Sequence, residues 1–316
     1  MFRAMVYSGG RQVQQFLGLT PGAQAAPRSS GGVVDLDRQF YGLDMRWSHR
    51  DRLLARPVTV TVGLNYDEQE EARRGWENFA GAGPSQVLGV QGRLRRDETN
   101  NMHNFDQYAQ GELAMSDRLS VSGGVRNRQV SFSSRDHFVA GANPDDSGTL
   151  QFSQISPVAG ALYKLTPLLH AYASYGKGFE TPTFAELAYR VSTATGAGIN
   201  TDLRPNKTTN YEVGAKAVVG DDTRVNVAAF HVDGDNEITT LTNTGGRAVF
   251  QNAGPSTRKG LSQTIGKVRL TEFARIDNLF DERYVGSVIV NETSRRYSES
   301  APGRAFFAGV SAEITF

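Results

Sequence analysis

The chain has 316 residues with 34 Lys and Arg, 33 Asp and Glu, and no Cys, for a formal net charge of +1. A balance this even gives no field that would attract nucleic acid, and the absence of Cys excludes disulfides, thiolate metal sites and thiol catalysis. Mean hydropathy is −0.41, and no apolar run approaches the ~20 residues of a membrane-spanning helix, which excludes a helical membrane protein.

The first residues, Met1–Gly10, do not lead into an apolar segment. A secretory signal peptide needs such a segment before its cleavage site. Ala23–Ala25 is therefore not expected to be a cleavage site, and no signal peptide is expected.

Four segments alternate apolar and polar side chains with a period of two. In chain order they are Tyr41–Trp47, Val58–Tyr66, Tyr211–Ala217 and Phe306–Phe316. Such alternation puts one apolar and one polar face on a β-strand. No long stretch repeats the 3.6-residue pattern of a helix.

Several of the strand-like segments are longer than the ~5–6 residues of an ordinary strand. The clearest are Gly32–His49, Asp117–Arg135 and Thr223–Leu241. A tilted strand needs ~9–11 residues to cross a bilayer, and outer-membrane strands project beyond it. These lengths therefore favour strands that cross a membrane.

Short and long connections alternate along the chain. Short turns are expected near Ser116–Arg118, Leu165–Pro167, Gly220–Asp222 and Ile265–Lys267, with a slightly longer one at Asp51–Arg56. The long polar segments are Thr20–Gly31, Glu70–Asn100, Asp136–Gly148, Thr181–Lys207, Asn236–Gly246 and Asp281–Pro302. We therefore predict an all-β fold: an antiparallel up-and-down transmembrane β-barrel of about 12 strands, with short periplasmic turns and long extracellular loops. Both termini are then expected on the short-turn side.

The different media on the two faces of the sheet explain why a closed barrel is predicted. Hydrocarbon offers no hydrogen bonds, so every backbone group must be paired and the sheet must close, with apolar side chains outward and polar ones inward. Trp47 and Phe316 lie near the short-turn ends of strands, where an aromatic girdle is expected. The alternative is a soluble β-sandwich with two apolar faces in a dry core, which gives no reason for the regular alternation of loop length.

Several segments of the second half resemble TonB-dependent outer-membrane receptors, which are barrels that import iron–siderophore and similar complexes. The matching segments are Tyr172–Leu187, Leu203–Thr208, Asn210–Lys216, Phe250–Gly254, Arg258–Gly260 and Ala274–Tyr284, followed by a closing strand that ends at Phe316. They lie in order over about Leu168–Phe316, and the earlier strands are compatible with them.

The resemblance implies the outer membrane of a Gram-negative bacterium, with outer-membrane lipid around the barrel. It also implies that Phe316 carries the recognition signal for the barrel-assembly machinery. Tyr284–Glu292 is similar to a segment common in receptors for iron complexes. A ferric siderophore or another small iron complex is the ligand that this implies, as cargo rather than as a cofactor.

The sequence departs from the family in two ways. A full receptor has a TonB-box, a plug domain and a 22-stranded barrel, whereas residues 1–316 are expected to form one partial barrel without a plug. TonB is therefore not expected as a partner, and energised transport by this chain alone is not expected. In addition, the junction near Ser262–Thr271 looks like an internal deletion that removed about four strands and kept an even count.

Six residues are candidates for ligand binding. Arg126, Arg128 and Lys177 are placed where they would face the lumen and attract an anionic ferric chelate, since Arg suits bidentate recognition of carboxylates and catecholates. Trp76, Phe79 and Phe184 are loop aromatics placed to meet a ligand outside the membrane. The plainer alternative for the charged residues is a solvated lumen wall balanced by Glu and Asp neighbours.

Other chemistry finds no support in the sequence. The five His (His49, His103, His137, His170 and His231) have no metal-ligand spacing, and no G-x-S-x-G motif or Ser/His/Asp group is present. We therefore expect no enzyme, metal site or cofactor. Two alternatives to a ligand-uptake receptor stay open: a passive or structural outer-membrane barrel, and a receptor fragment without a function of its own.

Overall fold

The computed structural model describes residues 1–26, 29–141, 143–190, 199–219, 223–244, 247–265, 268–277, 285–287, 299–300 and 305–314. Within them the chain forms one large antiparallel sheet in which each strand pairs with the next long strand of the sequence. No helix among these residues is long and apolar enough to cross a membrane.

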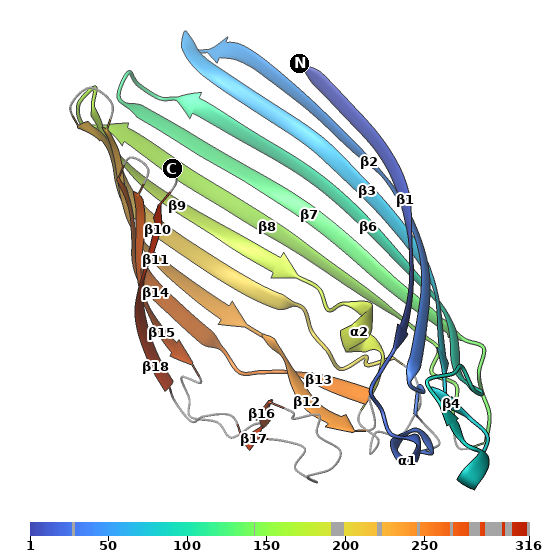
Figure 1. The fold of residues 1–316 in the computed structure, drawn as a ribbon. Coiled ribbons are helices and arrows are strands. Elements are labelled where there is room, and N and C mark those ends of the chain that lie inside the picture. Colours follow the sequence, from blue (N-terminus) through green and yellow to red (C-terminus); the bar gives the residue numbers. More distant parts are fainter. Residues whose placement is uncertain are drawn as a thin grey trace.

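Among the described residues, the large sheet contains twelve strands. In order across the sheet they are β1 (Phe2–Phe16), β2 (Val33–Leu53), β3 (Arg56–Trp76), β6 (Leu94–Ala114), β7 (Leu119–Asp136), β8 (Gly148–Lys164), β9 (Leu169–Glu180), β10 (Asn206–Val219), β11 (Thr223–Asp235), β14 (Ser256–Ile265), β15 (Val268–Asp277) and β18 (Ala305–Ile314). Short turns lie at the end where β1 begins and β18 ends (Figure 1).

The smaller elements all lie at the opposite, long-loop end (Figure 1). They are α1 (Pro21–Gln24), β4 (Phe79–Ala80), the 3₁₀ turn η1 (Gly83–Ser85), β5 (Val87–Leu88), α2 (Phe184–Leu187), β12 (Ile238–Thr244), β13 (Arg247–Asn252), β16 (Val285–Ser287) and β17 (Glu299–Ser300). β4 pairs with β5, β12 with β13, and β16 with β17, each as a separate two-stranded sheet.

Three predicted boundaries differ from the structure. β3 and β6 are each 21 residues long, so both ends of the expected loop Glu70–Asn100 belong to these strands and its middle part, 77–93, connects the two. The expected turn Asp51–Arg56 is tighter, because Leu54 and Ala55 adopt positive φ angles of 50° and 65° between β2 and β3. The expected strand Thr223–Leu241 breaks at Asn236 (φ 63°), and its end forms β12 in a separate hairpin.

The register gives the sheet two distinct faces. Val62 on β3 lies between Trp47 on β2 and Ala109 on β6, so these side chains share one face with Val58, Val60 and Leu64. Val60 and Val62 are about 40% and 39% exposed, and no second sheet covers this face among the described residues. It is therefore the lipid-facing exterior of a barrel wall and not one half of a sandwich core.

Aromatic side chains border the apolar belt toward the long loops. On the outer face they are Tyr41, Tyr66, Phe105, Tyr175 and Tyr211. Tyr175 and Tyr211 contact each other with ring centroids 5.4 Å apart, and the Tyr66 hydroxyl donates to Glu68 at 2.6 Å. Trp47, toward the short turns, stacks on His49 at 5.5 Å. The predicted girdle is present at Trp47, whereas Phe316 lies outside the described residues.

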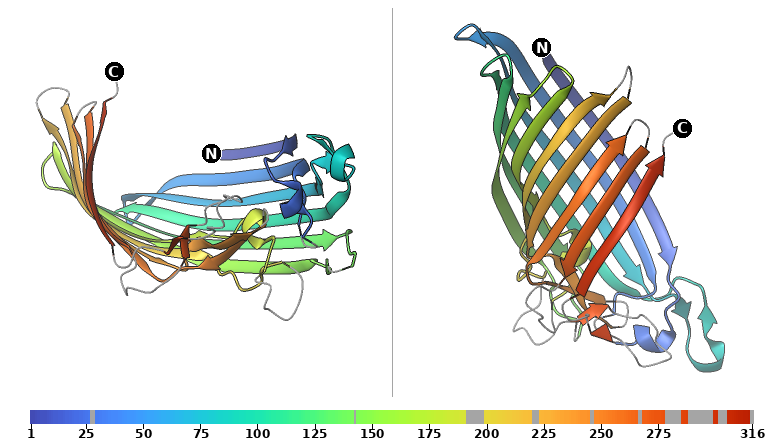
Figure 2. Two further views of the ribbon diagram at one scale, coloured as in Figure 1. Left: turned by 60° about the horizontal axis from the view of Figure 1, so that its bottom comes forward. Right: turned by 90° about the vertical axis from the view of Figure 1, so that its left-hand side faces the viewer.

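The sheet curls into an open trough, with β1 and β18 at its two edges (Figure 2). The described residues show no pairing between these two strands. Across the junction predicted as an internal deletion, β14 and β15 pair as neighbours, with Ser262 opposite Thr271.

Candidate functional site

A polar network lines the inner face of the sheet, opposite the apolar belt. Its centre is Asp106 on β6, whose side chain is 1% exposed. Asp106 pairs in register with Arg128 on β7. Its carboxylate accepts a hydrogen bond from Arg126 and lies 3.6 Å from Nε of Arg128. One carboxylate anchors two arginines, so this cluster presents a net positive charge to the lumen.

The network continues across the wall to β3 and β1. Nε of Arg128 donates to the side-chain Oδ1 of Asn104 at 3.0 Å, and Nδ2 of Asn104 donates to Asp67 on β3 at 2.8 Å. Asp67 also accepts the hydroxyl of Tyr7 from β1. Four strands are thereby tied together by polar side chains on the inner face.

Toward the long loops, the inner wall carries two further buried groups. Arg38 on β2 forms an ion pair with Glu71 on β3. On β6, Arg96 bonds Glu98 at 2.7 Å, donates to the Tyr189 hydroxyl, and lies over the Tyr189 ring with its Cζ 4.9 Å from the centroid. Tyr189 follows α2, so Arg96 ties this loop to the wall.

Apolar contacts fix α2 on the same inner face. Leu187 of α2 and Leu203 are buried against Val130 and Phe132 of β7, and the Phe184 ring lies edge-on to Phe132 with centroids 5.0 Å apart. Thr183 caps the helix: its hydroxyl accepts from the Glu186 amide, and the Glu186 carboxylate accepts from the Thr183 amide at 2.7 Å. The loop after β9 is therefore a packed cap over part of the lumen.

The loop between β3 and β6 holds its own ion pair. Glu77 is 2% exposed, and its carboxylate lies 2.8 Å from Nη2 of Arg93. The Glu77 carboxylate holds the pKa of the Arg93 guanidinium above its usual value. In the next loop, the Ser147 hydroxyl and amide hold the pKa of Asp145 below its usual value.

The structure separates the six predicted ligand residues. Arg126 and Arg128 share the inner face through Asp106, and their side chains stay 51% and 35% exposed. Lys177 on β9 pairs with Thr209 and alternates in step with Tyr175, so it lies on the outer face. The expected grouping of Lys177 with the two arginines at the lumen is therefore not found.

The three aromatic candidates lie within the loop packing. Phe184 belongs to the apolar cluster under α2, and Phe79 is buried at 8% exposure on β4. Trp76 ends β3 opposite Val33 and is half-buried. None of the three side chains is fully exposed, and their predicted contact with a ligand outside the membrane stays a prediction.

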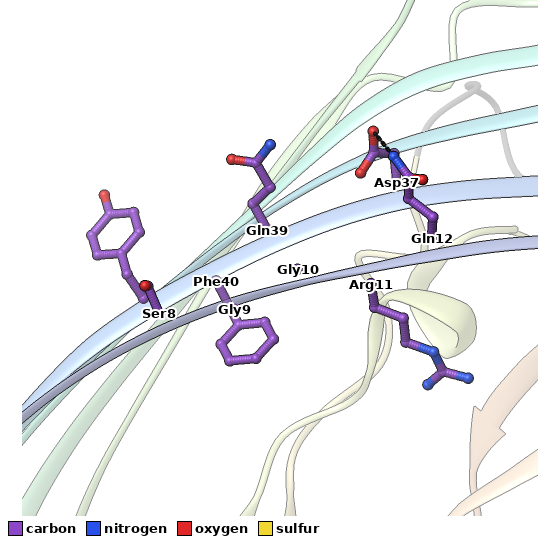
Figure 3. A pocket seen from close by; sticks show the side chains of 9 residues that line it. Ser8, Gly9, Gly10, Arg11, Gln12, Asp37, Gln39 and Phe40 are labelled. Atoms are coloured by element: carbon purple, nitrogen blue, oxygen red, sulfur yellow. Dashed lines mark hydrogen bonds between the residues drawn. The ribbon is translucent and has the colours of Figure 1, made fainter.

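Two open hollows lie on the outer face. One, of about 570 Å³, lies between β1 and β2. Figure 3 shows Ser8, Gln12, Asp37 and Gln39 on one side of these strands, with Phe40 and Arg11 on the other, and the Gln12 amide donating to Asp37 at 3.2 Å. The second, of about 510 Å³, is lined by His103, Gln129, Ser131, Gln151 and Ser153 beside Phe105.

No group of three His, Asp or Glu side chains with the geometry of a metal site occurs among the described residues. The acidic partners of the arginines are missing from the sequence-based candidates, most clearly Asp106 and Glu71. A usable signal existed for Asp106. Folding β6 and β7 about the turn near Ser116–Arg118 places Arg128 opposite Asp106.

Comparison with known proteins agrees with this geometry. A family model described as "TonB dependent receptor-like, beta-barrel" matches residues 5–265, which is most of the chain. The chain belongs to this family. It is therefore a β-barrel of the Gram-negative outer membrane from a family of receptors and transporters, not of enzymes.

Solved structures of TonB-dependent receptors share the fold at low identity. The ferric-catecholate import receptor Fiu of Escherichia coli K12 matches with a TM-score of 0.58 and 13% identity over 100% of this chain and 62% of that one. The ferripyoverdine receptor FpvA of Pseudomonas aeruginosa matches with a TM-score of 0.61 and 15% identity over 98% of this chain and 47% of that one. The copper transporter OprC matches with a TM-score of 0.62 and 16% identity over 87% of this chain and 43% of that one. The chain thus spans between about two fifths and three fifths of these receptors.

Proposed function

We propose that this TonB-dependent receptor barrel binds an anionic iron complex, such as a ferric siderophore, on its inner wall. The observation that carries the proposal is the Arg126–Asp106–Arg128 cluster. Two half-exposed guanidinium groups share one buried carboxylate, and guanidinium groups suit bidentate contacts to carboxylate or catecholate oxygens.

The proposal also draws on the related receptors. Fiu is described as a ferric-catecholate import receptor and FpvA was solved with ferripyoverdine, whereas OprC is described as a copper transporter. Family membership alone therefore does not select the cargo. The positive cluster favours a negatively charged chelate over a bare metal cation.

We assign residues 1–316 to the barrel part of such a receptor. In the family, energised import needs a plug and a TonB-box, and the described residues form barrel wall and loops. The proposal therefore covers ligand binding by the barrel. Release of the ligand to the periplasm requires energised transport, which these residues are not proposed to perform alone.

Binding of defined complexes to the refolded chain tests this function. Ferric catecholates and ferric citrate, which are anionic, should quench tryptophan fluorescence, while a neutral ferric hydroxamate should bind more weakly. Arg126→Gln and Arg128→Gln should each weaken binding about tenfold, a loss of roughly 1.4 kcal/mol. Arg56→Gln removes a guanidinium at the short-turn end, which pairs with Asp117 at 2.6 Å, and should leave binding unchanged.

Two results would contradict the proposal. One is equal binding of anionic and neutral chelates by the folded chain. The other is steady ion conductance in planar bilayers with no effect of any ferric complex, because that is the behaviour of a passive pore. Heat-modifiable migration on detergent gels verifies that each variant has folded before either measurement is made.

A further inference from the structure

Several tyrosines of the inner wall lie with the ring over a glycine of the neighbouring strand. The pairs are Tyr7 with Gly42, Tyr108 with Gly63, and Tyr172 with Gly214. In each pair a Cβ on the glycine would overlap the tyrosine ring. The absent side chain therefore lets the ring lie close against the backbone of the sheet, with its other face toward the lumen.

The hydroxyl of Tyr108 differs from the other two. Tyr7 donates to Asp67, and Tyr172 donates to Glu212 at 2.5 Å. The Tyr108 hydroxyl makes no hydrogen bond with a described residue, and its side chain is half-buried. A phenol hydroxyl both donates and accepts hydrogen bonds, so Tyr108 keeps this capacity for a ligand.

The register places Tyr108 in a row with two arginines on the inner face. Gly63 on β3 lies opposite Arg46 on β2 and opposite Tyr108 on β6, and Tyr108 lies opposite Arg126 on β7. The hydroxyl end of the Tyr108 ring lies over Gly63, so it points along the row toward Arg46. Strands lie ~4.8 Å apart, so the backbones at Arg46 and Arg126 are separated by roughly 14 Å, and Tyr108 occupies the interval.

The charges around this row favour an anion. Within two positions of it, the charged residues on the inner face of β2, β3, β6 and β7 are Arg46, Arg126, Arg128, Asp44 and Asp106. Asp106 is engaged with Arg126 and Arg128. Asp44 lies two residues from Arg46 on the same face, and Arg46 forms no ion pair with a described residue. Three guanidinium groups against two carboxylates leave a net charge of +1.

The tyrosine decides which kind of anion fits best. A guanidinium pairs with the oxygens of a carboxylate or a catecholate alike, so the arginines alone do not discriminate between them. The face of an aromatic ring adds a stacking contact that only a planar ring can use. The free hydroxyl can bond to an oxygen on that ring. A catecholate has the ring and the adjacent oxygens, whereas citrate has the oxygens alone.

We propose that Tyr108 makes the lumen site selective for aryl oxyanions, with a catecholate arm of the ferric chelate stacked on its ring between Arg46 and Arg126. The inference rests on the proposed binding of an anionic iron complex at Arg126 and Arg128. It adds the ligand class and the residue that selects it. Tyr7 and Tyr172, whose hydroxyls are engaged with carboxylates, then cover their glycines without a part in selection.

Titration calorimetry with the refolded full chain in detergent tests the selectivity. The probes are the ferric complex of a synthetic tris-catecholamide and ferric citrate. Tyr108→Leu removes the ring and the hydroxyl, and should bind the catecholamide complex about tenfold more weakly while its affinity for ferric citrate is unchanged. Tyr108→Phe keeps the ring and should weaken binding of the catecholamide complex only about threefold.

Two further variants separate ligand contact from a structural role. Gly63→Ala leaves Tyr108 in place, but the new Cβ would overlap its ring. The displaced ring should weaken binding of the catecholamide complex alone. Tyr172→Leu removes the comparable ring outside the arginine row and should leave both affinities at the wild-type values. Arg126→Gln should weaken binding of both complexes, and it tests the proposed function separately.

Three results would overturn the inference. They are equal losses for both complexes in Tyr108→Leu, unchanged binding of the catecholamide complex in Tyr108→Leu and Gly63→Ala, and the same selective loss in Tyr172→Leu. If Arg126→Gln weakens both complexes while Tyr108→Leu changes neither, the selectivity fails and the proposed function stands. If neither complex binds the folded wild-type chain, both fail.

Heat-modifiable migration on detergent gels verifies that each variant has folded. If Tyr108→Leu does not fold, Tyr108→Phe and Gly63→Ala decide the question. Unchanged affinity for the catecholamide complex in both of these variants then counts equally against the inference.

Discussion

On the inner wall, single side chains connect strands that are far apart in the sequence. Tyr7 donates to Asp67, Asn104 joins Asp67 to Arg128, and Asp106 holds Arg126. The contact from Tyr7 passes over β2 to reach β3, and the other two join neighbouring strands, so the pattern strengthens the sheet across its strands. The same contacts neutralise part of the charge that a ligand would meet. Asp106 therefore sets the balance between the stability of the wall and the positive charge left for a ligand.

Asp106→Asn tests that balance. The substitution leaves two guanidinium groups without their shared carboxylate, and we expect the folded barrel to lose about 1–3 kcal/mol. Urea unfolding of the chain in lipid vesicles measures the change. If Asp106 only fills space, the isosteric amide will unfold at the same urea concentration as the wild type.

Asp117→Asn is the matched control for Asp106→Asn. Asp117 also pairs with an arginine, Arg56, at 2.6 Å, but its side chain is 93% exposed. Exposed ion pairs contribute about 0–1 kcal/mol, so the midpoint should move little. A larger effect at Asp117 than at Asp106 would mean that burial does not decide the strength of these pairs.

At the scale of elements, the sequence predicts the strands well and their surroundings less well. The alternation in Val58–Tyr66 and the turn near Ser116–Arg118 locate β3, β6 and β7, because solvent on the two faces imposes a period of two. Asn236 breaks the expected strand because its left-handed conformation ends pairing, and nothing in the apolar pattern signals this.

The sequence predicts the candidate site only in part. The positions of Arg126 and Arg128 on a strand were readable, but the carboxylate that binds both depends on register across two strands. Lys177 lies two residues from both Tyr175 and Phe179, so the period of two places it with them on the outer face. Phe184 lies in a polar loop, and its burial against Phe132 arises only when that loop folds onto the wall.

Leu187→Ala tests whether α2 is a packed cap. Leu187 is fully buried against the inner wall, so truncation should cost about 3 kcal/mol of local stability. Hydrogen exchange should accelerate over 181–190 while β7 and β8 stay protected. Leu88→Ala, at a side chain that is 64% exposed on β5, should change neither; unchanged exchange in Leu187→Ala would show that the loop is held by other contacts.

The tight turn between β2 and β3 allows a stabilising change. Leu54 and Ala55 both adopt positive φ, which costs an L-residue with a Cβ roughly 1 kcal/mol. Leu54→Asn with Ala55→Gly supplies the residues that such hairpins prefer, and we expect a gain of about 1 kcal/mol in urea unfolding. Leu54→Asn with Ala55→Pro fixes φ near −65° and should destabilise instead; the reverse order of the two variants would contradict the turn geometry.

At the scale of the whole molecule, one sheet separates two solvents. The outer face carries an apolar belt bordered by Trp47 on one side and by Tyr66, Phe105 and Tyr211 on the other. The inner face carries ion pairs and the cap formed around α2. The trough shown in Figure 2 gives these faces opposite curvature. Successive residues of a strand point to opposite faces, so each side chain meets either lipid or the lumen according to its position in the alternation.

Neighbouring residues of β6 make this difference measurable. Ala109 pairs with Val62 and faces outward, whereas Gln110 pairs with Thr61 on the inner face, and both side chains are exposed. Arginine at the lipid-facing position near mid-belt should destabilise the inserted barrel by about 2–4 kcal/mol, while arginine at the wet inner position should change little. Urea unfolding of Ala109→Arg and Gln110→Arg in vesicles compares the two directly. Equal stabilities, or a larger loss for Gln110→Arg, would mean that the assignment of lipid and lumen to the two faces is wrong.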